Sequence, residues 1–242
     1  MRFLAILAAL PLAACGSVAI GSDKGDRVEP SGAGGSRTYQ VTDFTGVELA
    51  GADDVDVKVG SAFSVRAEGP AEELDKLEIR RDGDTLRVGR KRDGGWLKSS
   101  KPVKIHVTMP AIREASLAGS GDMTVDTVQG GDFEGDLAGS GNLRVGRLQA
   151  GKVSFDLAGS GNIVAGAGQA ERLEVDIAGS GNVEARGVKA RGADISIAGS
   201  GNVAAEVDGD AKVTIMGSGD VTLGGKARCT TSKMGSGSVR CG

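Results

Sequence analysis

The sequence repeats one stretch almost without change: DLAGSGNL at residues 136–143, DLAGSGNI at 156–163 and DIAGSGNV at 176–183. The Gly-Ser-Gly centre begins at residues 119, 139, 159, 179, 199, 217 and 235, and these positions are 20, 20, 20, 20, 18 and 18 residues apart. A shorter copy, LAGADDV at 49–55, indicates that the repeat begins near residue 45, with insertions. Repeats of nearly fixed length are typical of solenoids, in which each turn stacks on the one before it.

Apolar and polar residues alternate between the Gly-Ser-Gly copies. Val153, Phe155 and Leu157 share one parity, while Ser154 and Asp156 take the other. A period of two predicts strands with one buried face. We therefore expect an all-β fold, a right-handed parallel β-solenoid with coils of about 20 residues, and the rule for parallel crossovers favours that hand. The regular coils would occupy residues 111–242.

Gly-Ser-Gly is expected at the corner of each coil, because glycine adopts backbone conformations that other residues avoid. Stacked corners would align the residue that follows each of them into a column, made of Asn142, Asn162, Asn182 and Asn202 with Asp122 and Asp220 at its ends. Side-chain amides one strand spacing apart, about 4.8 Å, can form hydrogen bonds along such a stack. The asparagines are therefore expected to have a structural role.

Residues 38–110 follow the repeat less regularly. The pattern predicts strands at 48–59, 61–66, 77–81, 85–90 and 103–109, and a short helical turn at 70–74. Two arrangements are open for this part: irregular coils of the same solenoid, or a small β-layer that caps one end. The upstream copy at 49–55 and the lack of a linker near residue 110 favour irregular coils.

The N-terminus has the composition of an export signal. One arginine and a short apolar run occupy residues 1–14, which is too short for a membrane-spanning helix and predicts a signal peptide. Leu12 to Cys15, LAAC, resembles the cleavage box of bacterial lipoproteins, which implies a lipid on Cys15, and ordinary signal-peptidase cleavage is the alternative. Gly16 after that cysteine implies an outer-membrane address. Residues 15–37 would form a flexible linker that holds the domain away from the membrane.

Composition excludes several classes of protein. A net charge of −3 argues against nucleic acid as a partner, and a single histidine, His106, argues against His-based catalysis or metal binding. Three cysteines are too few for a disulfide-dense scaffold. Once Cys15 is set aside, Cys229 and Cys241 align with inward positions of the last coil, where a disulfide would close a weak end, and we expect one.

Two surfaces are candidates for interaction. Asp136, Asp156 and Asp176 would line up on the outside of one wall, with further carboxylates two residues before them in Glu134, Glu174 and Asp194. We expect these carboxylates to form a solvated polar face. The alternatives are weak Ca²⁺ binding and a glycan-hydrolysing carboxylate pair. Because these carboxylates follow the repeat instead of departing from it, no catalytic residue, cofactor or metal is expected.

The second candidate surface is a basic segment around Trp96, the only tryptophan. Its cations are Arg90, Lys91, Arg92, Lys98, Lys101 and Lys104. It departs from the repeat, so it is expected to be an excursion loop. Either Trp96 packs on the edge of the solenoid in a solvated loop, or the segment contacts anionic lipid headgroups or glycans.

Several short motifs in a fixed order resemble a known family. They are FTGV at 44–47, GDTL at 83–86, VTMP at 107–110 and SLAGSG at 116–121, together with the lipoprotein-like leader. The chain is similar over about residues 38–240 to the family named putative auto-transporter adhesin, head GIN domain. The resemblance implies an envelope β-solenoid without catalytic residues to transfer.

The function expected from the sequence is a non-catalytic lipoprotein of the cell envelope, lipid-anchored in the outer membrane, that displays a rigid solenoid for adhesion or envelope contacts. Its partners would be the membrane and a glycan or an envelope protein. The alternatives are an enzyme that cleaves polysaccharide with the acidic wall, and an envelope scaffold for a protein partner.

Overall fold

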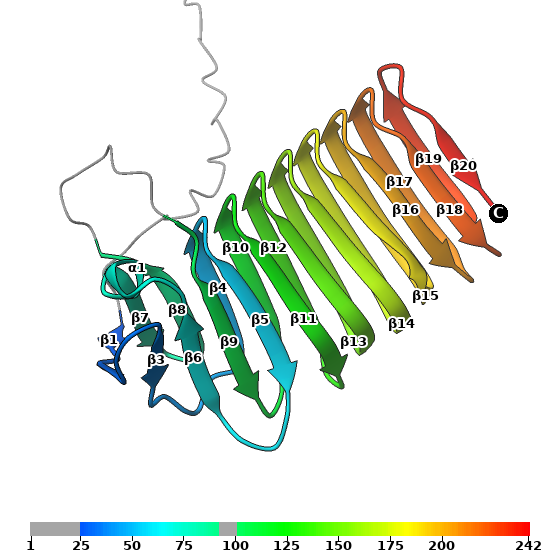
Figure 1. Cartoon of the computed structure of the whole chain (residues 1–242). Helices are drawn as coiled ribbons and strands as arrows, with labels where there is room; N and C mark the ends of the chain where they lie inside the picture. Colours follow the sequence, from blue (N-terminus) through cyan, green and yellow to red (C-terminus); the bar gives the residue numbers. More distant parts are fainter. Residues whose placement is uncertain (1–24, 92–100) are drawn as a thin grey trace, which may run out of the picture.

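The computed structural model describes residues 25–91 and 101–242. The chain is nearly all-β, with 70% strand and 2% helix, and its stacked coils form a β-solenoid, as the repeat predicts. The solenoid has about six turns. The strands lie side by side along one long axis (Figure 1). No helix in the two described ranges is long and apolar enough to cross a membrane.

Each coil consists of two walls joined at the Gly-Ser-Gly corner, and the corners form a row along the upper edge in Figure 1. We call the strands before the corners the first wall; they include β4 (Gly46–Gly51), β10 (Glu114–Gly119), β12 (Phe133–Gly139), β17 (Asp210–Gly217) and β19 (Arg228–Met234). The second wall includes β5 (Asp54–Val59), β11 (Asp122–Gln129), β16 (Asn202–Val207), β18 (Val221–Gly225) and β20 (Val239–Cys241). Three long strands run from the second wall round into the first wall: β13 (Asn142–Gly159), β14 (Asn162–Gly179) and β15 (Asn182–Gly199).

The coils stack in parallel and in the register of the repeat. Leu137 lies opposite Leu157, and Leu157 lies opposite Ile177. These side chains point between the walls and are at most 3% exposed, so the interior is one continuous apolar core. The upstream copy also stacks as expected, because Leu49 of β4 pairs with Leu117 of β10.

The expected column of asparagines is present on the outside of the second wall. The amide of each asparagine donates to the side-chain oxygen of the previous coil, at 3.0 Å from Asn162 to Asn142, 3.0 Å from Asn182 to Asn162 and 2.8 Å from Asn202 to Asn182. Asp122 accepts from Asn142 at the first end, at 2.8 Å, so the ladder ends on a group that only accepts. The asparagines therefore tie successive coils together.

The N-terminal part combines both arrangements that the sequence left open. Strands β8 (Thr85–Arg90) and β9 (Lys104–Met109) pair in parallel with β4 and β5 and extend the two walls. They lie outside β4 and β5 although they come later in the chain, because β10 and β11 occupy the other side of that first coil. The chain thus first adds a level, β8 with β9, on one side of the first coil. It then continues the solenoid from the other side of that coil with β10 and β11.

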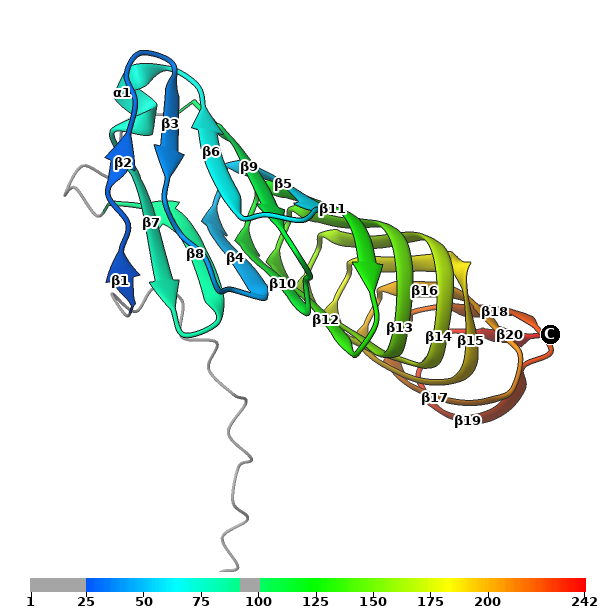
Figure 2. The same cartoon turned by 90° about the horizontal axis from the view of Figure 1, so that it is seen from below.

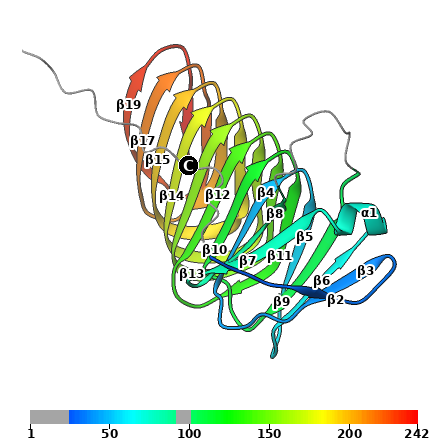
Figure 3. The ribbon, with the colours of Figure 1, turned by 90° about the vertical axis from the view of Figure 1, so that its left-hand side faces the viewer.

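Antiparallel strands cover this end of the solenoid (Figure 3). Strand β6 (Ser64–Glu68) pairs with β9 and with β3 (Ser36–Tyr39), and β7 (Leu77–Asp82) pairs with β8. The helical turn α1 (Ala71–Leu74) connects β6 to β7 and buries Leu74. These strands occupy the hydrogen-bonding edge that an open solenoid would expose.

The prediction of a flexible linker over residues 15–37 is wrong for the second half of that range, which contains short strands. Residues 26–27 form β1 (Asp26–Arg27), which pairs with β7, and residues 30–31 form β2 (Pro30–Ser31), which pairs with β3 (Figure 2). Their side chains are exposed, so no apolar periodicity marks them in the sequence. They are held by backbone hydrogen bonds to the free edges of the cap.

The C-terminal coil is closed by a disulfide between Cys229 of β19 and Cys241 of β20, with a Cα–Cα distance of 6.4 Å. Cys229 stacks on Ala211 and Cys241 on Leu223, which are the inward positions assigned from the repeat. Cys229 is only partly buried and Cys241 is exposed, because no further coil covers them.

Replacing Gly141 by alanine should destabilise the protein by about 4 kcal/mol or more, because the new Cβ would lie 2.0 Å from the carbonyl oxygen of Gly121 in the coil below. Gly83→Ala is the matched control: its φ of +58° is left-handed but nothing lies within 4 Å of the Cβ, so about 1–2 kcal/mol is expected. Urea unfolding measures both. Equal losses for the two variants would contradict the close stacking of the corners.

Reducing the disulfide, or replacing both cysteines by serine, should loosen the last coil alone. For a loop with a sequence separation of 12, the lost constraint is worth about 2–3 kcal/mol. Because each coil contacts only its neighbours, hydrogen exchange should accelerate in β19 and β20 and stay slow in β13 and β14. Acceleration spread evenly over the whole solenoid would contradict a local role.

Candidate functional site

Two columns of side chains face outward on the first wall. Asp136, Asp156 and Asp176 stack on one another in successive coils, and we call them the acidic column. Two residues later the same alternation places alanines outward, and we call these the alanine column: Ala118, Ala138, Ala158, Ala178 and Ala198. The sequence analysis correctly predicted that the three aspartates stack on one another, but it did not recognise the alanines as a surface.

A shallow groove of about 390 Å³ runs along the wall between the two columns. Both columns line it, and Ser116 and Ser196 lie at its ends. Beyond it the alanine column continues into Met216 and Met234, whose side chains are large, apolar and 55% and 76% exposed. The first wall therefore presents an apolar strip bordered by carboxylates.

Asp136 and Asp156 are half-buried, whereas Asp176 is exposed, so the first two members of the acidic column are less solvated than the polar face that the sequence predicts. Burial, together with the neighbouring carboxylates of Glu134, Asp156 and Glu114, raises the pKa of Asp136 from 3.8 to about 7. Burial likewise raises the pKa of Asp156, with Asp176 and Glu134 adding to the effect. Among the described residues no lysine or arginine lowers the pKa of either group or forms an ion pair with it.

The carboxylates two residues before the acidic column behave differently in its later coils. Lys152 Nζ lies 2.6 Å from Glu174 Oε2, and Arg172 forms an ion pair with Asp194. These pairs lie across neighbouring coils at the strand spacing. Uncompensated negative charge is thus concentrated around Asp136 and Asp156.

Three of these groups come close enough to share a cation. Carboxylate oxygens of Glu134, Asp136 and Asp156 all lie within 4.8 Å of one another. Oxygen ligands suit Ca²⁺, but exposed acidic groups often cluster without a metal. The same closeness and the raised pKa of Asp136 also resemble the paired carboxylates of glycosidases.

The basic segment is not one continuous cationic surface. Arg90 turns inward, where its guanidinium donates to Asp53 at 2.8 Å from Nε and 2.5 Å from Nη2, and to Glu73 at 2.6 Å. Asp53 is 1% exposed and also accepts from the backbone N–H of Val103 at 3.0 Å. The sequence analysis missed this cluster, whose signal is that Asp53 stands where other copies have the second corner glycine.

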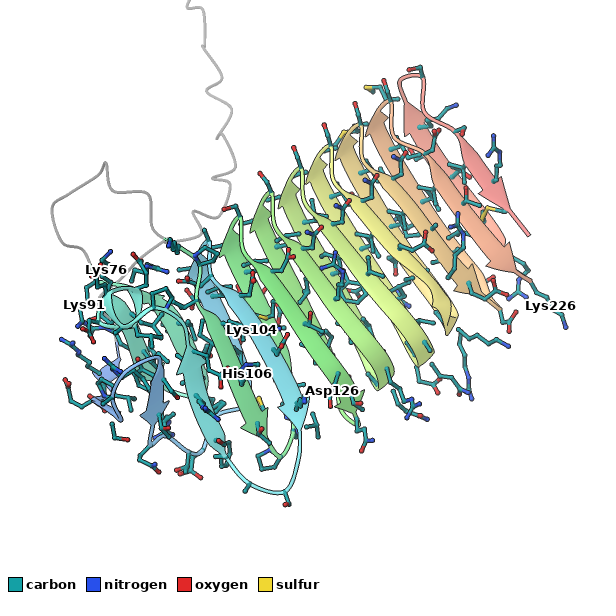
Figure 4. All side chains as sticks on the ribbon, in the orientation of Figure 1. Lys76, Lys91, Lys104, His106, Asp126 and Lys226 are labelled. Carbon is teal, nitrogen blue, oxygen red and sulfur yellow. A yellow bond between two sulfur atoms is a disulfide. The ribbon has the colours of Figure 1, made fainter. Side chains whose placement is uncertain are left out.

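Two further described cations of the segment, Lys91 and Lys104, also have partners. Lys91 donates to the carbonyl of Asp75 at 2.6 Å, and Lys104 lies 2.8 Å from Asp56. Figure 4 shows Lys104 and His106 on the same strand, β9, and His106 lies 40% exposed on the outer face as expected. Trp96, with Arg92 and Lys98, and Cys15 lie outside the described residues, so the placement expected for them stays a prediction.

Comparison with known proteins gives a family and a set of similar structures. Residues 43–227 match the family model described as "Putative auto-transporter adhesin, head GIN domain". A putative adhesin from Bacteroides fragilis is 19% identical with a TM-score of 0.77, over 85% of this chain and 95% of that one. A putative adhesin from Parabacteroides distasonis is 18% identical with a TM-score of 0.67, over 90% and 99%.

A third similar structure carries a different description. It is a putative lipid binding protein from Parabacteroides distasonis, 25% identical with a TM-score of 0.65, over 86% of this chain and 96% of that one. A search of curated proteins finds no match.

Replacing Asp136 by asparagine should stabilise the protein at high pH only. Asp136 has a folded pKa of about 7 against an ordinary value of 3.8, so its ionisation costs stability as the pH rises from 3.8 through 7. The midpoint of thermal unfolding should rise by roughly 2 °C or more at pH 8 and stay unchanged at pH 4. The control is Glu184→Gln on the second wall, where Arg186 Nη1 lies 2.7 Å from the carboxylate. An equal gain at both pH values would contradict a buried, repelled Asp136.

Proposed function

The chain belongs to the family described as "Putative auto-transporter adhesin, head GIN domain", and on that basis we propose that it is a non-catalytic interaction module of the cell envelope. The observation that carries the proposal is the groove of the first wall, which runs across several coils and is bordered by Asp136, Asp156 and Asp176. A rigid stack with a repeating outer surface suits the binding of a long partner.

We infer a lipid anchor at Cys15 for this module. The support is the LAAC stretch at 12–15 behind a short apolar run. The acyl chains would hold the protein in the outer membrane, and each buried CH₂ group adds about 0.8 kcal/mol to membrane affinity. The capped N-terminal end would then lie nearest the membrane, because the chain enters the fold there.

Polysaccharide hydrolysis is the second candidate function, and one observation favours it. Asp136 has a raised pKa and lies beside Asp156, which is the relation between a general acid and its partner carboxylate. Against it, the groups follow the repeat, and the groove is lined by alanine and has no aromatic side chain on which a sugar could stack. An envelope scaffold for a protein partner is the remaining alternative, and it would use an open strand edge or the segment around Trp96 instead of the groove.

The anchor is tested by expressing the full chain in a double-membraned bacterium and labelling it with palmitate. The wild-type chain should carry the label and sediment with the outer membrane, while Cys15→Ser should lose both properties. An unlabelled wild-type chain would exclude the lipid anchor.

The interaction function is tested on the same cells with a variant in which Asp136, Asp156 and Asp176 are all replaced by asparagine. Cell-to-cell aggregation and retention on surfaces coated with envelope fragments should fall at least about fivefold. Purified protein is assayed in parallel for release of reducing ends from acidic polysaccharides. Turnover that Asp136→Asn abolishes would replace adhesion by hydrolysis as the function.

A further inference from the structure

The groove of the first wall combines properties that together limit what can bind in it. Its floor is apolar, because the alanine column and the backbone of three successive coils form it. One border carries Asp136, Asp156 and Asp176, and one end continues into the exposed side chains of Met216 and Met234. A partner must therefore offer apolar groups to the floor and suitable charge to the border.

Charge complementarity selects a cationic partner. Asp136, Asp156 and Asp176 form no ion pair with any lysine or arginine of the described residues, whereas Glu174 and Asp194 nearby already pair with Lys152 and Arg172. A second copy of the same wall would bring like charges together, and an anionic lipid surface would be repelled for the same reason. Lysine or arginine side chains would instead find both a carboxylate and an apolar surface for their methylene groups.

The backbone of the wall limits the conformation of the partner. Strand β12 pairs with β10 on one edge and with β13 on the other, so the strands of the groove have no free edge to which a peptide strand could add. The backbone groups of the partner must therefore be satisfied by water or within the partner itself. A polyproline II helix meets this condition, since it has no internal hydrogen bonds and exposes its backbone to water.

The repeat distances agree with that conformation. Asp136 and Asp176 are two coils apart, which is about 9.6 Å at the usual spacing of strands. Three residues of polyproline II rise about 9.3 Å, so every third side chain of such a peptide returns to the same place relative to the coils. Alternate side chains of a β-strand recur at about 6.6 Å, which does not match one coil or two.

We propose that the groove binds an extended polypeptide in the polyproline II conformation that runs along the solenoid axis with lysine or arginine at every third position. This inference rests on the proposed function, because it names the partner of the same surface. The cations contact Asp136 and Asp176, and the intervening apolar residues lie on the alanine column.

The test uses three synthetic peptides of twelve residues with the wild-type protein. One repeats Pro-Pro-Lys, the second has the same composition with the lysines grouped at one end, and the third repeats Pro-Pro-Glu. The Pro-Pro-Lys repeat should bind at least about tenfold more tightly than the grouped peptide by fluorescence anisotropy, and the glutamate peptide should not bind. Binding should weaken with added salt, as expected for partly exposed charges. Equal affinity for the first two peptides would overturn the proposed spacing.

Variants then locate the site. The triple Asp136→Asn, Asp156→Asn, Asp176→Asn protein should bind the Pro-Pro-Lys peptide at least about tenfold more weakly. The triple Glu72→Gln, Glu171→Gln, Glu184→Gln protein loses the same number of charges outside the groove and should bind as the wild type does. A second groove variant, Ala158→Arg, should also lose binding, since it fills the floor and adds a cation. Equal weakening in the control would overturn the groove as the site.

The failure of this inference can be told apart from failure of the proposed function. If the groove variant loses cell aggregation but the wild-type protein binds no cationic peptide, the interaction surface stands and the peptide partner is wrong. If a chitosan oligomer of the same charge binds more tightly than the peptide, the partner is an amino-sugar polymer and the inference is overturned. If aggregation is unchanged by the groove variant, the surface itself is wrong.

Discussion

The close stacking of the corners is the constraint on which the rest of the structure depends. At Gly119, Gly139 and Gly159 the backbone has φ between +129° and +139°, and a Cβ on the second corner glycine, such as Gly141, would overlap the coil below. Only glycine permits the backbones of successive corners to come this close. Each coil must therefore bring its corner glycines back over those of the previous coil after a nearly fixed number of residues. That return keeps inward residues inward, so one apolar core runs the length of the molecule.

The same register that builds the core also stacks like side chains on the surface, with opposite consequences for amides and for carboxylates. Asparagine both donates and accepts, so the column from Asn142 to Asn202 stabilises the contacts between those successive coils. Aspartate only accepts when ionised, so burial and the neighbouring carboxylates raise the pKa values of Asp136 and Asp156. The negative charge of this column opposes folding at neutral pH. A partner of opposite charge would reduce the repulsion, which supports the proposed interaction function.

The two ends of the solenoid meet the problem of open strand edges in different ways. At the N-terminal end, β8 and β9 add a level outside β4 and β5, and antiparallel strands cover that level. Arg90, at the end of β8, turns inward and forms ion pairs with Asp53 and Glu73, and these pairs hold the added level in place. At the other end β19 and β20 form the last described coil, and the disulfide between Cys229 and Cys241 joins its two walls.

The sequence by itself determined the solenoid, the parity of its core, the asparagine column and the alignment of the three aspartates, because all of these follow from a short local period that each coil repeats. Only the tertiary structure decided that β8 and β9 lie outside the earlier strands, that residues 25–37 pair with the cap, and that Arg90 meets the buried Asp53. It also decided that Asp136 and Asp156 are half-buried beside an apolar groove. These features depend on backbone pairing and burial between segments far apart in the chain, and such contacts leave no periodic trace in the residues that make them.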